Sequence, residues 1–271
     1  MIFYFSATGN CKRTAERIAR ETGDQLVSIH DVMRTEAEHP GAGTFRYGLK
    51  PDERLGFVSP VYDWRLPSVV EQFLTRLELS GAVPAYTFLV ITYGTTTGDT
   101  GNLAAKLLAA KGIKLDARFS VQMPDTWTPT FNLSDPAKVG RQVERGERDI
   151  DITIERIRQR ETGDFMRRKI PAIVNPVTRV MYDRTRRCEN LHVDDSRCIG
   201  CGLCARQCPV AAIEMHAGPS SKPRDRRPSW AKDRCAMCLG CLHRCPKHAI
   251  YYGNGHATNA HGQYVNPHTK L

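Results

Sequence analysis

The chain has 271 residues, of which 41% are hydrophobic and 25% charged, a balance typical of a folded globular protein rather than a disordered or fibrous one. No apolar run approaches the roughly 18–20 residues that cross a bilayer, which excludes a membrane-spanning helix. The apolar start Met1–Phe5 has no basic stretch before it. It indicates a first strand rather than a signal peptide, so we expect a cytoplasmic protein.

Short apolar runs alternate with helical patterns over residues 1–125. Strands are predicted at residues 1–5, 26–29, 55–59, 86–92 and 117–122, and helices at 11–21, 67–79 and 101–112, with Asn10 as the cap of the first helix. Apolar strands separated by helices indicate a parallel sheet covered on both faces. Because a barrel needs about 250 residues, we predict an α/β fold with a five-stranded doubly wound parallel sheet over residues 1–134.

A basic connector is predicted after this sheet. Ser134-Asp135-Pro136 is typical of a helix start, and apolar residues at near-heptad spacing predict a long helix from about 136 to about 160. Residues 164–188 combine seven arginines and lysines with apolar side chains, interrupted by Pro171 and Pro176. This pattern is typical of a membrane-surface segment or of a connector whose apolar side packs between domains. We expect the connector, a helical linker over residues 135–188.

Eight of the ten cysteines fall between Cys198 and Cys245, in two copies of one pattern 37 residues apart. Each copy reads C-x2-C-x2-C-x3-C-P, the spacing at which three thiolates hold one [4Fe–4S] cluster and the fourth reaches the other cluster. Structural zinc and buried thiols are the alternatives, but zinc sites favour separated C-x2-C pairs, often with histidine. We therefore assign Cys198, Cys201, Cys204 and Cys245 to one cluster, and Cys235, Cys238, Cys241 and Cys208 to the other.

This repeat predicts a small α+β domain of the two-cluster ferredoxin type over residues 189–252. The remaining residues, 253–271, are rich in glycine, asparagine and histidine, and a mobile tail is predicted there.

Three loops at the carboxyl ends of predicted strands carry the residue types of a flavin site. Hydroxyls, a glycine and a helix start in the first loop form an anion cradle, and aromatic residues in the other two are suited to sandwich a flat ring. Buried aromatics and turn-capping hydroxyls are the alternative interpretation. The residues are Ser6, Ala7, Thr8, Gly9, Asn10 and Cys11 in the first loop, Pro60, Val61, Tyr62 and Trp64 in the second, Thr92, Tyr93, Gly94 and Gly98 in the third, and Trp127 as a further aromatic candidate.

Phe5–Asn10, Pro60–Tyr62 and Thr92–Gly94 resemble the phosphate and ring loops of flavodoxins. With the cysteine repeat, they make the chain similar, up to about residue 252, to the bacterial EFR-type ferredoxin family, in which a flavodoxin-like domain is fused to a two-[4Fe–4S] ferredoxin domain. The resemblance implies FMN, with its phosphate at Ser6 to Asn10 and its ring between the later loops.

Cys11 departs from this pattern, because flavodoxins usually have serine or threonine at its position. A thiol is a weaker hydrogen-bond donor, so looser FMN binding is expected. A reactive thiol of low pKa at the helix start is the other possibility. We expect an inert replacement.

The sequence therefore predicts an electron-transfer protein that passes electrons between FMN, two [4Fe–4S] clusters and an external redox partner. One alternative is a flavin-dependent reductase fed through the clusters, with Asp63, Asp99 and Asp125 as candidate proton donors, although no catalytic residue is assigned. Another is a ferredoxin whose flavodoxin-like domain has lost FMN and only docks a partner.

The charge distribution predicts the character of that partner. The formal net charge is +10, and residues 197–271 carry eleven basic against three acidic side chains. We expect a redox protein with an acidic docking surface, and no specific nucleic acid. The basic loop His216–Lys232 is either a docking patch for this partner or a solvated insertion.

Overall fold

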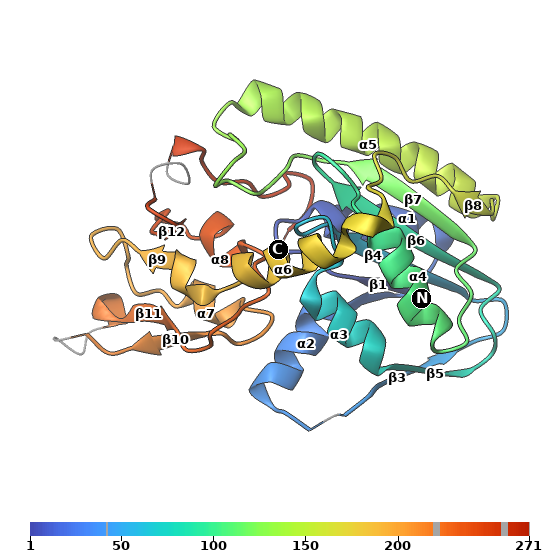
Figure 1. The fold of residues 1–271 in the computed structure, drawn as a ribbon, viewed down its shortest axis with the longest axis horizontal. Helices are drawn as coiled ribbons and strands as arrows, with labels where there is room; N and C mark the ends of the chain where they lie inside the picture. Colours follow the sequence, from blue (N-terminus) through green and yellow to red (C-terminus); the bar gives the residue numbers. More distant parts are fainter. Residues whose placement is uncertain (42, 219–222, 256–259, 271) are drawn as a thin grey trace.

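The computed structural model describes residues 1–41, 43–218, 223–255 and 260–270. Its centre is a six-stranded sheet in the order β2-β1-β4-β6-β7-β8, with all neighbours parallel (Figure 1). The strands are β1 (Ile2–Tyr4), β2 (Leu26–Ser28), β4 (Arg54–Pro60), β6 (Tyr86–Tyr93), β7 (Ala117–Gln122) and β8 (Gly163–Asp164). The α/β class and the five predicted strands are confirmed. The sixth, β8, was missed because Gly163 and Asp164 carry no apolar side chain.

Helices cover both faces of this sheet (Figure 1). On one face lie α1 (Asn10–Thr22) and α5 (Pro136–Arg158), packed around a core that includes Ile2 and Phe88. On the other lie α2 (Ile29–Glu38), α3 (Ser68–Arg76) and α4 (Thr100–Ala109), around a core that includes Phe3 and Leu89. Successive strand residues point to opposite faces, so a sheet with two cores needs the near-continuous apolar strands seen in the sequence.

Several predicted details are wrong. The helix predicted to reach residue 79 ends at Arg76, because Leu77 is extended and begins β5 (Leu77–Gly81), which pairs with β3 (Phe45–Leu49) in a separate parallel two-stranded sheet. The cap of α1 is Gly9, in the left-handed conformation at φ 98°, rather than Asn10. Asn10 is the first helical residue, and its side-chain oxygen accepts hydrogen bonds from the C-terminal segment instead.

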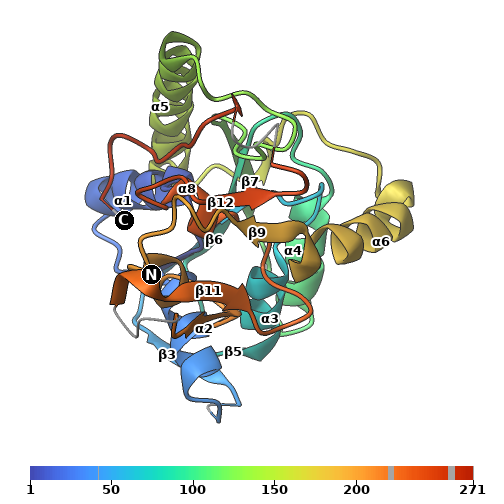
Figure 2. The same ribbon diagram turned by 90° about the vertical axis from the view of Figure 1, so that its left-hand side faces the viewer.

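The cysteine-rich part forms a smaller unit beyond the carboxyl ends of the sheet strands (Figures 1 and 2). Its elements repeat at the 37-residue spacing of the sequence: β9 (Leu191–Val193), α7 (Leu203–Arg206) and β10 (Ile213–His216) correspond to β11 (Arg227–Trp230), α8 (Gly240–His243) and β12 (Ile250–Tyr252). Antiparallel pairing joins β9 to β12 and β10 to β11, so each pair takes one strand from each copy. The two copies are therefore interleaved.

The connector follows the prediction only in part. Its helix α6 (Asn175–Thr185) has Pro176 in the first turn, and 3-10 turns lie before and after it at Ala172–Val174 and Cys188–Asn190. A third 3-10 turn, Pro223–Asp225, belongs to the cysteine-rich part. Tyr182 is buried, but Val177 and Val180 are 69% and 53% exposed, so much of the apolar side does not pack between domains. Among the described residues, no helix is both long and apolar enough to span a membrane.

The tail predicted to be mobile is packed over its described residues 260–270. The Leu133 N–H donates to the His261 carbonyl, and the Asn266 N–H donates to the Thr8 carbonyl. Tyr264 is buried against Leu133 and Val143. The prediction of a mobile tail rested on composition, but a few specific contacts decide whether a polar segment is ordered.

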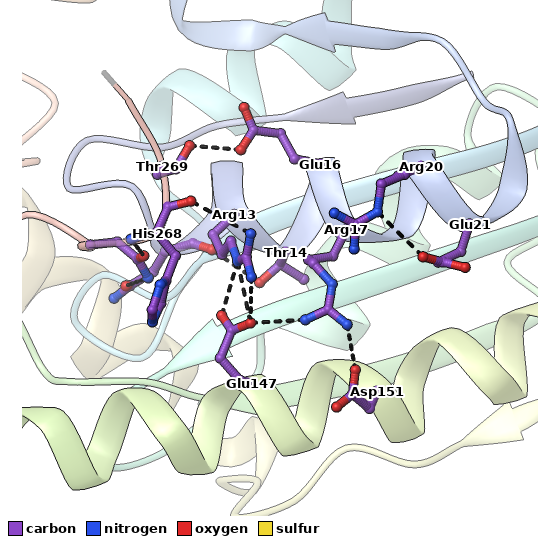
Figure 3. Close-up of polar contacts among 12 residues, drawn as sticks. Arg13, Thr14, Glu16, Arg17, Arg20, Glu21, Glu147, Asp151, His268 and Thr269 are labelled. Carbon is purple, nitrogen blue, oxygen red and sulfur yellow. Dashed lines mark hydrogen bonds and ion pairs between the residues drawn. The ribbon is translucent and has the colours of Figure 1, made fainter.

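Ion pairs join α1 to α5 on the same face of the sheet (Figure 3). Glu147 accepts from both Arg13 and Arg17, at 2.7 and 2.8 Å, and Arg17 also pairs with Asp151. Burial opposes ionisation of Glu147, but the hydrogen bond and charge of Arg13, with the charge of Arg17, hold its pKa below the usual value. This network anchors the helix that begins at the first predicted flavin loop.

We expect Glu147→Gln to lower the free energy of unfolding by about 1–2 kcal/mol, because two partly buried guanidinium groups lose their shared carboxylate. Glu21→Gln is the matched control, since Glu21 and Arg20 form an exposed pair (Figure 3) whose loss should cost about 0.5 kcal/mol or less. Anaerobic urea denaturation followed by circular dichroism measures both. Equal effects of the two substitutions would contradict a structural role for the network.

Candidate functional site

The loop after β1 is held between that strand and the start of α1. The Gly9 N–H donates to Ser6 Oγ at 3.1 Å, which closes the turn before the helix. The first N–H groups of a helix have no partner inside it, so this turn presents donors that suit an anion. Lys12 and Arg13 form ion pairs with Glu16 and Glu147. The cradle therefore relies mainly on backbone N–H groups and hydroxyls.

The loops after β4 and β6 approach each other closely. Gly98 has φ 59°, and a Cβ there would lie 1.9 Å from the Trp64 carbonyl oxygen, which accepts from the Asp99 N–H at 3.0 Å. Gly94 packs against the loop after β7, where its Cβ would lie 2.3 Å from the Asp125 Cβ. A neighbouring loop thus leaves no room for a side chain at either glycine, through backbone atoms at Gly98 and the Asp125 side chain at Gly94.

These loops enclose a cavity of about 340 Å³, within the size range of small-molecule sites. Gly9 and Gly98 shape the loops without lining the cavity. The other predicted flavin-site residues all line it: Ser6, Ala7, Thr8, Asn10, Cys11, Pro60, Val61, Tyr62, Trp64, Thr92, Tyr93, Gly94 and Trp127.

Two further walls of the cavity were not predicted. One is the inner side of α6, with Met181, Tyr182 and Thr185. The other is the second cysteine copy, with Met237, Cys238 and Leu239. Cys238 was predicted as a cluster ligand, but no sequence signal places it beside the flavin loops, because that proximity arises only when the two halves of the chain pack together.

Cys11 has the surroundings of an unreactive thiol rather than a reactive one. It is buried in the cavity wall, and its Sγ lies 3.0 Å from Thr92 Oγ1. Burial raises the pKa of the Cys11 thiol to about 12, against a smaller opposing effect of the Thr92 hydrogen bond. This direction of the pKa shift favours the inert replacement over the low-pKa alternative.

Two of the three candidate proton donors line the cavity. Burial raises the pKa of Asp125, although its Oδ1 accepts from the Trp127 N–H at 3.1 Å. Burial also raises the pKa of Asp63, against a hydrogen bond with Thr185. Asp99 does not line the cavity, and its backbone N–H instead ties the β6 loop to Trp64.

The two cysteine loops have matching backbone geometry. Gly200 and Gly202 have φ 66° and 70°, and Met237 and Leu239, each 37 residues later, have φ 49° and 53°. Backbone N–H groups also point at equivalent sulfurs, with Ala212 donating to Cys208 Sγ at 3.2 Å and Ala249 to Cys245 Sγ at 3.3 Å. N–H donors near thiolates stabilise their negative charge and raise the reduction potential of a cluster.

The cysteines of the repeat lie close enough to affect one another's ionisation. Burial raises the pKa of Cys204 to about 11, and the neighbouring Cys201, Cys245 and Cys198 raise it further. Burial likewise raises the pKa of Cys241 well above its usual value, with added effects of Cys238, Cys208 and Cys204. Buried thiolates need a strong positive charge beside them, which iron supplies, so this donor set fits iron–sulfur clusters. Among the described residues, no three His, Cys, Asp or Glu side chains are arranged to hold a single metal ion.

Several polar contacts clamp the two halves of the chain together. His243 is buried, its Nε2 lies 2.8 Å from the Thr126 carbonyl, and its Nδ1 accepts from the Tyr264 N–H at 3.1 Å. Burial lowers the pKa of His243 to about 4, so the ring is neutral and bonds at both nitrogens. The Tyr182 hydroxyl, meanwhile, donates to the Ala236 carbonyl at 3.3 Å.

Comparison with known proteins matches two parts of the chain to known families. Residues 1–149 match the family described as a flavodoxin domain, and residues 197–249 match the family described as a 4Fe-4S dicluster domain. A curated relative is NADH-quinone oxidoreductase subunit 9 of Rhodothermus marinus, which is 50% identical over 34 residues, 12% of this chain and 15% of the relative. The match thus spans only a small part of that protein.

Three solved structures match parts of this chain at low similarity. A putative flavoprotein from Bacteroides uniformis has a TM-score of 0.30 and 15% identity, covering 46% of this chain and 90% of that one. The Trp repressor binding protein from Bacillus subtilis has a TM-score of 0.34 and 9% identity, covering 60% and 99%. Rubredoxin oxygen:oxidoreductase from Desulfovibrio gigas has a TM-score of 0.31 and 16% identity, covering 56% and 36%.

We expect Gly94→Ala to weaken FMN binding, because the new methyl group would push the Asp125 loop out of the cavity wall. Overpacking of this kind costs about 1–3 kcal/mol, roughly a 5- to 150-fold loss of affinity. Gly140→Ala is the control, since a Cβ at Gly140 meets no atom within 4 Å. Fluorescence titration of flavin-free protein measures both affinities, and an unchanged affinity in Gly94→Ala would contradict this account of the cavity.

Proposed function

The chain belongs to the flavodoxin domain family over residues 1–149, and from this premise we propose that it joins one FMN to two [4Fe–4S] clusters and exchanges electrons with a partner protein. It is an electron-transfer protein with a flavodoxin domain and an iron–sulfur domain. The observation that carries the proposal is that Cys238 lies in the wall of the flavin cavity.

The cavity residues would hold FMN in two parts. The turn Ser6–Asn10 offers hydroxyls and helix-start N–H groups to the phosphate. Aromatic side chains around the rest of the cavity, Tyr62, Trp64, Tyr93 and Trp127, suit the flat ring. When bound, FMN supplies an exchange of two electrons in one-electron steps, and each cluster supplies an exchange of one.

The proposed ligand sets place one cluster beside the cavity and one farther out. Cys235, Cys238, Cys241 and Cys208 would hold the inner cluster, and Cys198, Cys201, Cys204 and Cys245 the outer one. Ala7 and Cys238 both flank Gly240, since a Cβ added there would lie 3.6 Å from Ala7 Cβ and from Cys238 Sγ. In this division residues 1–134 bind FMN, 135–188 connect and 189–252 hold the clusters. Reduced cysteines suit a cytoplasmic location.

We place the partner at the outer cluster. Cys201 is exposed, and Ile199 beside it is 44% exposed. Arg206 and Lys247, both exposed, add positive charge close to the ligands Cys204 and Cys245 in sequence. The arrangement suits an acidic redox protein. The other candidate patch, loop His216–Lys232, includes Ser220, Ser221 and Lys222, which lie outside the described residues.

Charge reversal tests the docking site. We expect Arg206→Glu to weaken association with an acidic plant-type ferredoxin, and the loss to shrink at high salt because the attraction is screened. Lys114→Glu, at an exposed lysine far from the cysteine loops, is the control. Calorimetric titration measures both, and equal effects of the two reversals would place the partner elsewhere.

A flavin-dependent reductase is the second candidate function. The observation that favours it is Asp125, whose raised pKa and position in the cavity wall suit a proton donor. Oxidation of the reduced protein that requires a small substrate, and that Asp125→Asn abolishes, would establish this activity.

Two ligand substitutions test the electron-transfer proposal. Cys238→Ser and Cys201→Ser each replace one thiolate, in the inner and the outer set. We expect each to change the EPR signal of a different reduced cluster. Only Cys238→Ser should slow electron exchange between FMN and the clusters in stopped-flow measurements, because only Cys238 lines the cavity. Equal slowing by both substitutions, or by neither, would refute the proposed order.

A further inference from the structure

The C-terminal strap, residues 263–270, crosses the outside of the turn Ser6–Asn10. Its Asn266 N–H donates to the Thr8 carbonyl at 2.8 Å. Its side chains also press on Gly9, where a Cβ would lie 2.9 Å from the Asn266 Cβ. Tyr264 and Asn266 are 5% and 1% exposed. The strap is therefore part of the packing around the proposed phosphate site.

A chain of hydrogen bonds within the strap sets the orientation of Asn10. The backbone N–H of His268, which can only donate, bonds to Asn266 Oδ1 at 2.9 Å. The other corner of that amide, Nδ2, must then be the donor to Asn10 Oδ1, at 3.0 Å. The Tyr264 hydroxyl donates to the same oxygen at 2.7 Å, and burial raises the pKa of Tyr264, which keeps this donor protonated.

The amide nitrogen of Asn10 is consequently turned away from the strap. Asn10 is only 7% exposed and lines the cavity beside Ser6 and Thr8. Within residues 1–41, 43–218, 223–255 and 260–270, its nitrogen has no hydrogen-bond partner. This nitrogen is open to the cavity, so its two N–H groups are free to donate to an acceptor bound there. A phosphate oxygen is a strong one, because hydrogen bonds to charged groups are stronger than neutral ones.

We propose that Tyr264 and Asn266 are positioning residues that fix the Asn10 amide so that its nitrogen binds the phosphate of FMN. The inference rests on the proposed FMN site. In this proposal, Tyr264 and Asn266, which lie outside both the flavodoxin domain and the cluster domain, contribute to recognition of the phosphate. The strap also holds the cluster domain, since the Tyr264 N–H donates to His243. One segment thus supports the phosphate site and the domain contact together.

Comparison of FMN with riboflavin tests this role, because the two share the ring and only FMN carries the phosphate. The full chain, with its clusters intact, is freed of flavin under anaerobic conditions and titrated with each compound by fluorescence. We expect Tyr264→Phe to weaken FMN binding by about 3- to 10-fold, the range for one lost hydrogen bond. Riboflavin binding should stay unchanged. The neighbouring Val265→Ala, at a 39% exposed position, should change neither affinity.

A second variant guards against a simple folding defect. Asn266→Ala removes the amide donor to Asn10 without adding a charge beside the phosphate site, so we expect it to weaken FMN selectively as well. Equal losses for FMN and riboflavin, or no loss for FMN, would overturn the inference and leave the FMN site in place. Wild-type protein that binds neither flavin would overturn the proposed function itself, and the inference with it.

Discussion

The contact between the Met237–Leu239 loop and the flavin cavity is the constraint on which the rest of the structure depends. That loop carries a predicted cluster ligand, Cys238, and forms one wall of the cavity. Segments far apart in the chain hold it there. Tyr182 of α6 bonds to the Ala236 carbonyl, and His243 bonds to Thr126 and to Tyr264 of the strap. Much of the chain after residue 160 therefore serves to bring two redox sites together.

Burial destabilises the thiolates at this contact, and positive charge and N–H donors stabilise them. Burial makes each isolated thiolate unfavourable and raises the pKa of Cys238 to about 11. The same burial excludes water and keeps the proposed centres close, which favours electron transfer over side reactions. N–H groups directed at Cys208, Cys235 and Cys245 compensate part of the negative charge. Iron must supply the remainder, so the structure is adapted to the clusters its sequence pattern predicts.

Periodic and repeated features of the fold were predictable from the sequence. The apolar strands from Ile2 to Gln122 and the 37-residue repeat each depend on local patterns, and both appear in the structure. Features that depend on tertiary contact were not predictable. The tail predicted to be mobile is ordered by Tyr264 and Asn266, and the wall formed by α6 has no local signal. The prediction that Asn10 caps α1 was wrong for the same reason, since a distant segment donates to its side-chain oxygen.

The most direct test of the account is the cofactor content of anaerobically purified protein, measured as iron, sulfide and released flavin. We expect about eight irons and one FMN per chain, with broad absorbance at about 400 nm that bleaches on reduction. About eight irons without FMN, even after FMN is added, would mean that the protein is a ferredoxin with a docking domain. Zinc in place of iron, after anaerobic reconstitution has also failed, would contradict the central claim.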